Sequence, residues 1–283
     1  MSNVLRGKAV ADAMDVETTA RAEALKAKGV EPCIGILRVG EREDDLAYER
    51  GALKRAEKNG VAVKQVLLPA DASQEDLLAA IKDLNEDDSV HGVLLFRPLP
   101  KQMDEAEACE ALLPEKDLDG ITRGSMASIY SGTGAGFAPC TAEGCIELLK
   151  YYGVEMSGKR AVVIGRSLVI GKPVAMLLMA NNATVTVCHS RTQNMPDVVK
   201  EADIVICALG RGEMIDGKYF REGQTVLDVG INWSEEKGKL VGDVLFEEAE
   251  PIVDAITPVP GGCGSATTAV LIRHVVEAAE NAK

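Results

Sequence analysis

Apolar runs and amphipathic segments alternate along the first hundred residues. The apolar runs are rich in Val, Ile and Leu, and they predict buried strands at 33–39, 61–68 and 92–96. Between them, apolar residues at helical spacing predict helices over 45–59 and 73–85. A series of strands joined by helices predicts a mostly parallel sheet, because parallel neighbours need a long crossover connection.

A second series of the same kind begins near residue 141. Its helices are expected at 141–152 and at the end of the chain, from about 265 to 281. Its strands are expected at 160–164, 183–187, 204–208 and 225–229. The pattern therefore predicts an α/β protein with two domains and a boundary near residue 140.

Composition and charge narrow the classes of function. The chain has 283 residues, of which 46% are hydrophobic and 27% are charged, and its formal net charge is −13. Such a charge repels nucleic acid and anionic membranes, so we expect neither as a partner. No apolar stretch is long enough for a membrane helix, and the first residues lack the apolar run of a signal peptide. We therefore expect a cytoplasmic protein.

Cysteine and histidine positions argue against a disulfide framework and a metal centre. The seven cysteines are an odd number, are scattered, and include no C-x-x-C pair, which favours a reducing compartment. The three histidines, His91, His189 and His274, have no metal-ligand spacing. We expect no catalytic metal.

A glycine turn follows the strand at 160–164. Gly165 would let the backbone turn tightly, Gly171 would allow close packing at the start of a helix, and Pro173 suits the first helical turn. Free N–H groups at such a helix start can bind the phosphates of a dinucleotide. The spacing is not G-x-G-x-x-G, so an ordinary turn between a strand and a helix fits equally well.

The end of the next strand favours a dinucleotide with an extra phosphate. An NAD site usually has an Asp or Glu there, which accepts the ribose 2′-hydroxyl. This chain has Ser190 and Arg191 instead, which suit a 2′-phosphate, and Arg166 in the glycine turn could add a second cation. NADP is therefore the expected cofactor, against the alternative that Ser190 and Arg191 are merely solvated loop residues.

These motifs, together with four further blocks, resemble the FolD family of methylenetetrahydrofolate dehydrogenase/cyclohydrolases. The blocks are Lys116-Asp-Leu-Asp-Gly120, Phe137-Ala-Pro-Cys-Thr141, Val226-Leu-Asp-Val-Gly-Ile-Asn232 and Thr257-Pro-Val-Pro-Gly-Gly262. They occur in the family's order and at nearly constant spacing, from about Gly35 to the final helix.

The resemblance implies a fold, a reaction and partners. Residues 1–140 would form a βαβ folate-binding catalytic domain, with the last helix, 265–283, packing back on it. Residues 141–264 would form a Rossmann domain for NADP. The reaction would be oxidation of 5,10-methylenetetrahydrofolate to the 5,10-methenyl form by hydride transfer to NADP, which is mainly a positioning problem. Tetrahydrofolate derivatives would be the ligands, and the family implies a homodimer joined through the nucleotide domain.

The resemblance also implies the residues of the site. Tyr48 and Asp119 would be catalytic, and Asp119 would accept hydrogen bonds from the pterin N–H groups. The substrate would be bound by Tyr48, Asp119, Pro98, Leu99, Pro260, Gly261 and Gly262. The cofactor would be bound by Gly165, Arg166, Ser167, Gly171, Ser190, Arg191, Gly210 and Ile231. Cys263 is read as a packing residue.

Two positions depart from the family pattern. The family has a Lys four residues after the Tyr, where this chain has Ala52, and a Gln where this chain has Phe96, followed by Arg97 instead of Leu. Lys54 points to another face of the helix. Arg55 lies on the right face, but Arg does not readily give up a proton.

These departures affect hydrolysis of the methenyl product more than hydride transfer, since hydrolysis needs an activated water. We therefore expect a dehydrogenase whose cyclohydrolase step is weakened. Three alternatives stay open: a fully bifunctional enzyme that yields 10-formyltetrahydrofolate, a non-catalytic NADP- or folate-binding protein, and a Rossmann oxidoreductase for another small substrate.

Overall fold

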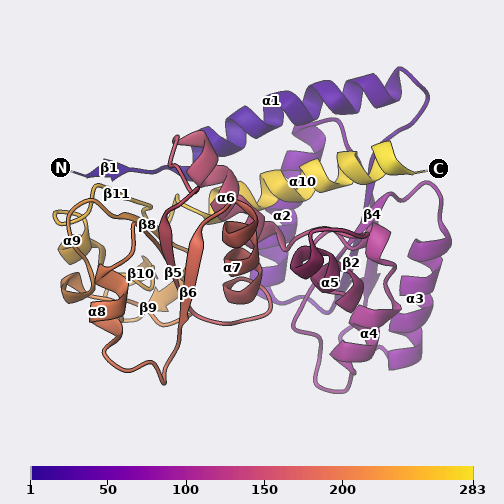
Figure 1. Ribbon diagram of the computed structural model, residues 1–283. Helices are drawn as coiled ribbons and strands as arrows, with labels where there is room; N and C mark the ends of the chain where they lie inside the picture. The colour runs from indigo at the N-terminus through magenta and orange to yellow at the C-terminus, as the bar shows by residue number, and fades with distance from the viewer. Residues whose placement is uncertain (1, 283) are drawn as a thin grey trace. The chain divides into compact units, whose positions relative to one another are not determined.

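The computed structural model describes residues 2–282, which form two compact units (Figure 1). The first contains Ala13–Cys140 and the residues from Thr268 onward, and we call it the three-stranded unit after its sheet. The second contains the residues up to Asp12 and Thr141–Thr267, and we call it the six-stranded unit.

The three-stranded unit is built around a short parallel sheet in the order β3-β2-β4. Its central strand, β2, is buried along nearly its whole length. The elements of this unit are β2 (Cys33–Val39), α2 (Glu43–Lys58), β3 (Ala62–Leu68), α3 (Gln74–Glu86), β4 (Gly92–Leu95), α4 (Glu105–Ala111), η1 (Pro114–Lys116), α5 (Arg123–Ser131) and most of α1 (Gly7–Lys26) and α10 (Gly264–Asn281).

Its core forms where α3 and α4 cover the sheet. The alternate residues Leu37 and Val39 of β2 and Val93 and Leu95 of β4 pack with the apolar face of α3. Ser73 caps α3 by accepting a hydrogen bond from the Asp76 N–H, and the Asp76 carboxylate accepts from the Ser73 N–H in return.

The six-stranded unit contains an all-parallel sheet in the order β1-β11-β8-β7-β5-β6. Its strands are β1 (Asn3–Val4), β5 (Arg160–Ile164), β6 (Thr184–Cys188), β7 (Ile204–Cys207), β8 (Thr225–Asp228) and β11 (Ala255–Ile256), and β9 (Asn232–Ser234) pairs with β10 (Lys239–Val241) in a separate antiparallel hairpin. Its helices are α6 (Cys140–Tyr151), α7 (Gly171–Ala180), α8 (Met195–Lys200), η2 (Gly217–Tyr219) and α9 (Phe246–Ala249).

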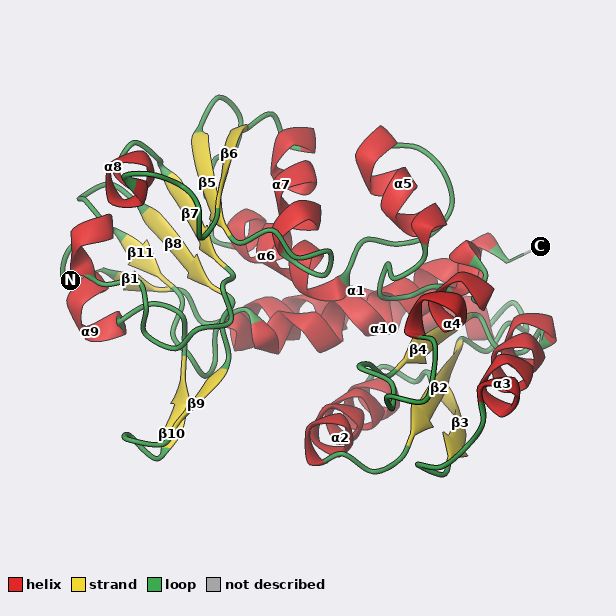
Figure 2. Cartoon of the chain, turned by 90° about the horizontal axis from the view of Figure 1, so that it is seen from below, coloured by secondary structure: helices red, strands yellow, loops and turns green. Residues whose placement is uncertain are grey.

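Helices cover both faces of this sheet. Figure 2 shows α7 on one face and α8 and α9 on the other. Val162 and Ile164 of β5 join the core under α8, together with Val205 of β7. The intervening residues point to the opposite face, where α7 packs on β5 and β6. This doubly covered parallel sheet explains why its strands read as continuous apolar runs.

The strands predicted from the sequence agree with the structure to within one or two residues, and so do the helices predicted in each series. The pattern did not predict the helices α1, α4, α5, α8 and α9, the short helices η1 and η2, or the short strands β1, β9, β10 and β11. The expected domain of residues 1–140 differs from the structure at its start, because β1 pairs with β11 and Asn3 donates a hydrogen bond to the Asp254 carbonyl.

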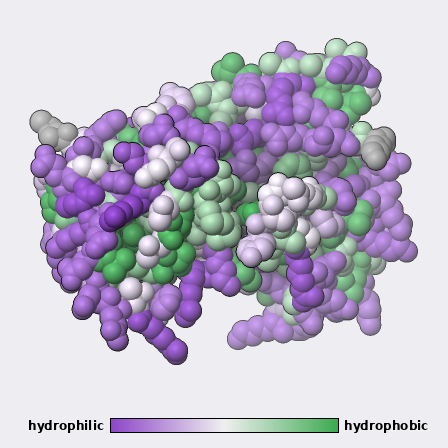
Figure 3. All heavy atoms as spheres, viewed as in Figure 1, coloured by the Kyte–Doolittle hydropathy of each residue, from purple (hydrophilic) through white to green (hydrophobic). Residues whose placement is uncertain are grey.

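One face of the molecule is drawn with its side chains in Figure 3. On the face shown in Figure 3, hydrophilic residues predominate and apolar residues are exposed in small patches. Within residues 2–282, no helix combines the length and the apolar character that a membrane crossing requires.

Candidate functional site

The residues expected to bind the cofactor follow four neighbouring strands of the six-stranded unit. Gly165 follows β5, Ser190 and Arg191 follow β6, Gly210 follows β7, and Ile231 follows β8. These strands are parallel, so their carboxyl ends share one edge of the sheet. The strand order reverses at β5, which lies between β6 and β7, and open parallel sheets bind ligands at such a reversal.

The glycine turn after β5 has a geometry that only glycine allows. Gly165 has a φ of +128°, and a Cβ atom there would collide with the Ala208 carbonyl oxygen. A Cβ at Gly171 would lie 2.5 Å from the Gly165 carbonyl oxygen. The Ser167 hydroxyl accepts hydrogen bonds from the N–H groups of Ile170 at 3.2 Å and Gly171 at 3.3 Å. Ser167 thus caps the start of α7.

Ser190 and Arg191, in the turn after β6, are exposed, and Thr192 is half-buried. The His189 N–H donates to the Thr192 hydroxyl at 2.9 Å, and the Arg191 N–H donates to His189 Nδ1 at 3.2 Å. His189 therefore shapes this turn through its ring nitrogen. Arg166 is also exposed. Each of these cations is available to a ligand at the edge of the sheet.

A buried carboxylate fixes the loop that contains Gly210, and the sequence analysis did not find it. Asp243 accepts hydrogen bonds from the backbone N–H groups of Leu209 at 2.5 Å, Gly210 at 3.0 Å and Arg211 at 2.8 Å. It also accepts from Asn232 Nδ2 at 3.0 Å and is fully buried. The only sequence signal was its place in Val241-Gly-Asp-Val244, a polar residue among apolar ones.

Asp228, at the end of β8, is a second buried carboxyl group. Burial raises its pKa to about 7, although the N–H groups of Val244, Asp243 and Gly230 donate to it at 2.9–3.0 Å and oppose that shift. The nearby Asp243 charge raises it further. Between about pH 4 and about pH 7, the folded protein therefore keeps a proton on Asp228 that the unfolded chain has released.

The raised pKa of Asp228 predicts a loss of stability as pH rises. Its contribution is greatest below the unfolded pKa near 3.8 and is lost as pH rises through about 7. The free energy of unfolding should fall by about 2–3 kcal/mol from this group between about pH 5 and about pH 8. Urea denaturation at several pH values measures it, with Asp228→Asn as the variant that cannot titrate. Equal pH dependence in both proteins would contradict the prediction.

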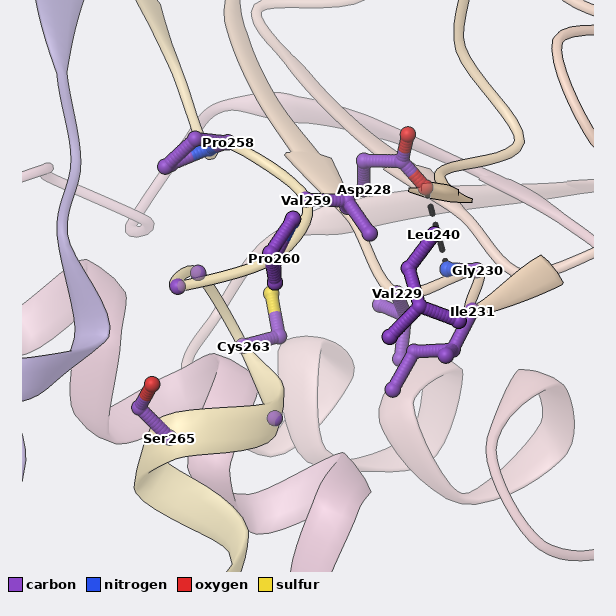
Figure 4. A pocket seen from close by; sticks show the side chains of 13 residues that line it. Asp228, Val229, Gly230, Ile231, Leu240, Pro258, Val259, Pro260, Cys263 and Ser265 are labelled. Carbon is purple, nitrogen blue, oxygen red and sulfur yellow. Dashed lines mark hydrogen bonds between the residues drawn. The ribbon is translucent and has the colours of Figure 1, made fainter. Parts of the chain in front are cut away.

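A pocket of about 250 Å³ lies beside this edge of the sheet (Figure 4). Figure 4 shows Ile231 and Leu240 next to each other on one side, and Ser265 at the start of α10 on another. Pro260, Gly261 and Gly262 also line it, as does Cys263, which is 3% exposed. This pocket therefore brings together three residues expected to bind the substrate, Pro260, Gly261 and Gly262, and one expected to bind the cofactor, Ile231.

In the three-stranded unit, Tyr48 is fixed by the packing of α2. Its neighbour Glu49 is buried and forms an ion pair with the buried Arg38 at 2.8 Å, and Gln65 Nε2 donates to Glu49 at 2.5 Å. The Tyr48 ring meets Phe96 edge-to-face, with centroids 5.9 Å apart. Burial, followed by the charges of nearby Cys140 and Asp119, raises the pKa of Tyr48 well above 10.

The two Asp residues of the Lys116–Gly120 block have different roles. Asp117 is fully buried and accepts from the N–H groups of Ile121 at 3.0 Å and Thr122 at 2.8 Å, and from the Ser125 hydroxyl at 2.7 Å. It organises the start of α5. Asp119 instead accepts from the Cys140 N–H at 2.9 Å. Because Cys140 is the first residue of α6, Asp119 also contacts the start of a helix, so the structural alternative of a capping Asp applies to both residues.

His274 of α10 contacts the Lys116–Gly120 block, and no role for this residue was predicted from the sequence. It is 1% exposed, and its Nδ1 lies 2.8 Å from the Leu118 carbonyl oxygen and 3.8 Å from Cys140 Sγ. Its ring stacks on Phe137 with centroids 4.6 Å apart. Since Leu118 and Cys140 flank the Asp119 contact, His274 helps to set the position of that carboxylate.

Two residues that could have replaced the family's Lys are placed by the structure. Lys54 is exposed on α2. Arg55 is held by Asp15, with both carboxylate oxygens 2.8 Å from its Nη1, and it donates to the Thr268 hydroxyl at 3.0 Å. Arg55 is therefore committed to joining α2 with α1 and α10. Ala52 itself is 1% exposed.

The expected substrate-binding residues are divided between the units. Pro98 and Leu99 follow β4 in the three-stranded unit, which also contains Tyr48 and Asp119. Pro260, Gly261 and Gly262 belong to the six-stranded unit. Residues 2–282 contain no group of three or more His, Cys, Asp or Glu side chains placed to hold a metal ion.

Comparison with known proteins finds one family over both units. Residues 5–119 match the model of the tetrahydrofolate dehydrogenase/cyclohydrolase catalytic domain, and residues 139–283 match that of the NAD(P)-binding domain. The bifunctional protein FolD of Carboxydothermus hydrogenoformans is 50% identical over 281 residues, which are 99% of this chain and 98% of that protein.

Two solved structures give the same result. The bifunctional FolD enzyme of Campylobacter jejuni has a TM-score of 0.96 and 38% identity, with 99% of each chain covered. The Trypanosoma brucei methylenetetrahydrofolate dehydrogenase-cyclohydrolase, solved with NADP and an inhibitor, has a TM-score of 0.92 and 36% identity, covering 99% of this chain and 98% of that one.

Proposed function

Because this chain belongs to the tetrahydrofolate dehydrogenase/cyclohydrolase family, we propose that it oxidises 5,10-methylenetetrahydrofolate to 5,10-methenyltetrahydrofolate with NADP. One observation carries the proposal beyond family membership. In the unit matched by the catalytic-domain model, Asp119 lies near Tyr48, and one of its carboxylate oxygens accepts the Cys140 N–H at the start of α6. A carboxylate so placed can accept the N–H groups of a reduced pterin.

The residues of the six-stranded unit fit NADP. Glycine is required at position 165, because a Cβ atom there would collide with the Ala208 carbonyl oxygen. The exposed cations Arg166 and Arg191 supply positive charge for the phosphates. Gly165, Arg166, Ser167, Gly171, Gly210 and Ile231 would hold the dinucleotide. Ser190 and Arg191 would hold its 2′-phosphate. When bound, NADP supplies the nicotinamide C4 that accepts the hydride.

The side chains of the three-stranded unit hold the substrate rather than transfer protons. Asp119 would accept the pterin N–H groups, and Pro98 and Leu99 would contact the substrate. Tyr48 stays protonated at neutral pH, because its pKa is raised, so it can donate a hydrogen bond. The Phe96 ring beside it makes that surface apolar and reduces access of water. Positioning of this kind can supply much of the barrier reduction for hydride transfer.

The second step of the family is proposed to be weak here. Hydrolysis of the methenyl cation requires a group that activates water. Ala52 and Phe96 provide none, Arg55 is held by Asp15, and Lys54 lies at the surface. The second candidate is a fully bifunctional enzyme, which is favoured by the relative at 50% identity that is named a bifunctional protein.

The experiment that tests this proposal uses two assays on the purified protein. With methylenetetrahydrofolate and NADP, we expect formation of NADPH, and less with NAD. With methenyltetrahydrofolate alone, we expect decay close to the uncatalysed rate. Absence of reduced dinucleotide in the first assay would reject the dehydrogenase, and rapid decay in the second would favour the bifunctional candidate.

Arg191→Ala should weaken the preference for NADP. Losing one charge-assisted hydrogen bond of about 1.5–3 kcal/mol predicts a fall of about 10- to 100-fold in kcat/KM with NADP, and little change with NAD. Arg160→Ala is the matched control, because Arg160 is an exposed cation of the same unit at the opposite end of β5. An equal fall with both dinucleotides would mean that Arg191 does not contact the 2′-phosphate.

The assembly and location proposed for the enzyme rest on its surface and its thiols. A homodimer through the six-stranded unit is supported by β6, an edge strand with Val187 39% exposed, and by Met179 of α7, which is 52% exposed. Light scattering in solution tests this proposal: a particle mass of two chains supports the homodimer, and a mass of one chain contradicts it. All seven cysteines are free, which suits a reducing cytoplasm.

A further inference from the structure

Three arginines follow three neighbouring strands at one edge of the six-stranded sheet. Arg166 follows β5, Arg191 follows β6 and Arg211 follows β7, and these strands lie side by side in the order β7-β5-β6 (Figure 2). All three residues are exposed. The first two were expected from the sequence to bind the cofactor, whereas no role was predicted for Arg211.

Within residues 2–282, none of these three arginines forms an ion pair, although the chain has a formal net charge of −13. Arginines at the opposite edge of the same sheet are paired. Arg160, at the amino end of β5, has its Nη1 3.4 Å from Glu201 Oε2, and Arg221, shortly before β8, has its Nη2 3.5 Å from Asp203 Oδ1. Uncompensated positive charge therefore lies at the edge where the carboxyl ends of the strands meet.

The backbone at Arg211 is held on two sides. Its N–H donates to the buried Asp243 carboxylate at 2.8 Å, as do the two N–H groups that precede it at 2.5 and 3.0 Å. On the other side, a Cβ at Gly212 would lie 3.1 Å from Val241 Cγ2 and 3.3 Å from Asn232 Cβ. The fold thus fixes where this arginine begins and leaves its side chain exposed to a ligand.

The acidic groups next to Arg211 already have partners. Glu213, two residues further along the chain, has its Oε1 2.5 Å from Lys237 Nζ. Asp243 uses one carboxylate oxygen for the Arg211 N–H and Asn232 Nδ2, and the other for the N–H groups of residues 209 and 210. Neither carboxylate is available to the guanidinium, so an anion that pairs with it must come from a ligand.

The position of β7 indicates which part of a dinucleotide this cation would meet. The turns after β5 and β7 touch, because a Cβ at Gly165 would collide with the Ala208 carbonyl oxygen. The turn after β6, with Arg191 proposed for the 2′-phosphate, lies on the other side of β5. The diphosphate of a dinucleotide lies at the glycine turn itself. Arg211 is therefore beside the diphosphate, on the side away from the 2′-phosphate.

We propose that Arg211 is a third cation of the cofactor site and binds the diphosphate of the dinucleotide, a group that NADP and NAD share. The proposal rests on the proposed function and adds a residue to its cofactor site. A guanidinium can donate two parallel hydrogen bonds to phosphate oxygens. Arg191 and Arg211 then have different roles: the first distinguishes NADP from NAD, and the second binds both.

Calorimetric titration with NADP and with NAD tests this division without turnover. For Arg211→Gln, we expect the dissociation constants of both dinucleotides to rise about tenfold. Arg211→Lys keeps the charge and should raise them less than about threefold. Arg191→Ala should weaken NADP and leave NAD unchanged. Arg160→Gln, which removes an exposed cation from the opposite edge of the sheet, is the matched control and should change neither.

Two further ligands identify the group that Arg211 contacts. Adenosine 2′-monophosphate carries a 2′-phosphate without a diphosphate, and tetrahydrofolate carries carboxylates without a phosphate. Their dissociation constants should be the same for Arg211→Gln as for the unaltered protein. Weaker binding of either ligand would overturn the proposal, because the charge would then serve another anion or the variant would have a wider defect.

An unchanged dissociation constant for NADP in Arg211→Gln would also overturn the proposal, and so would a loss with NADP alone. If the unaltered protein binds NADP but forms no NADPH, the proposed function fails, while the role of Arg211 is still decided by the dissociation constants. Thermal melting of each variant checks that it is folded.

Discussion

Replacing Asp119 by Asn should lower kcat/KM for oxidation of methylenetetrahydrofolate by about 100- to 1,000-fold. The carboxylate can accept two N–H groups of a pterin, whereas an amide presents one acceptor and one donor to the same edge. Losing charge-assisted hydrogen bonds worth about 1.5–3 kcal/mol each accounts for that range. Initial rates of NADPH formation measure it.

The fold should survive this change, because Asp119 makes one backbone contact, with Cys140, and the block is organised by Asp117 and His274. The matched control is Asp71→Asn, which removes the same charge from an exposed turn of the same unit. It should leave the rate unchanged. A rate in Asp119→Asn within about threefold of the unaltered enzyme would exclude Asp119 as the pterin acceptor.

The second large effect is expected from Ala52→Lys combined with Phe96→Gln. Position 52 lies one helical turn after Tyr48, so a Lys there would share its face. Lys alone would meet the Phe96 ring, and an apolar surrounding disfavours both its charge and the water it must activate. The pair together should raise the rate of methenyltetrahydrofolate hydrolysis at least about tenfold, within the range of general acid–base catalysis.

The rate is measured from the decay of methenyltetrahydrofolate without dinucleotide. Each single variant should give much less than the pair, and Ala47→Lys, which adds a charge on an exposed part of α2, should give nothing. If the unaltered enzyme already hydrolyses methenyltetrahydrofolate quickly, other groups activate the water and the departures at 52 and 96 have a different cause.

The pattern of apolar residues was enough for the strands that build both sheets, because a strand buried on two faces reads as a continuous apolar run. It failed for α1. The buried face of that helix includes small or polar residues such as Ala11, Thr18 and Ala22, so the apolar contrast is weak. It also failed for β1, whose partner β11 is some 250 residues away and leaves no local signal.

The candidate site likewise contains some residues that could be found from the sequence and others that could not. Glycine at 165 could be found from the sequence, because the backbone geometry of the turn restricts the residue type. The Asp119 block was found through the family resemblance, and its contact with a pterin stays a prediction. Asp243 and His274 could not. Each is a single buried polar residue whose role depends on backbone groups from distant segments, namely the loop at 209–211 and Leu118.

The structure shows what surrounds the two positions that depart from the family pattern. Phe96 is buried against Tyr48, and Ala52 leaves that part of α2 without a polar group. Arg55, one turn further along α2, is held by Asp15. Tyr48 and Asp119 remain near this surface, and both can form hydrogen bonds that bind and orient a substrate.

The most direct measurement is the transfer of isotope from substrate to dinucleotide. Methylenetetrahydrofolate carrying deuterium on its bridging carbon is incubated with the enzyme and NADP, and the reduced dinucleotide is analysed by mass spectrometry. The account predicts that deuterium from that carbon appears in NADPH and that Asp119→Asn abolishes nearly all of it. Reduced dinucleotide without deuterium, or none at all with NADP or NAD, would contradict it.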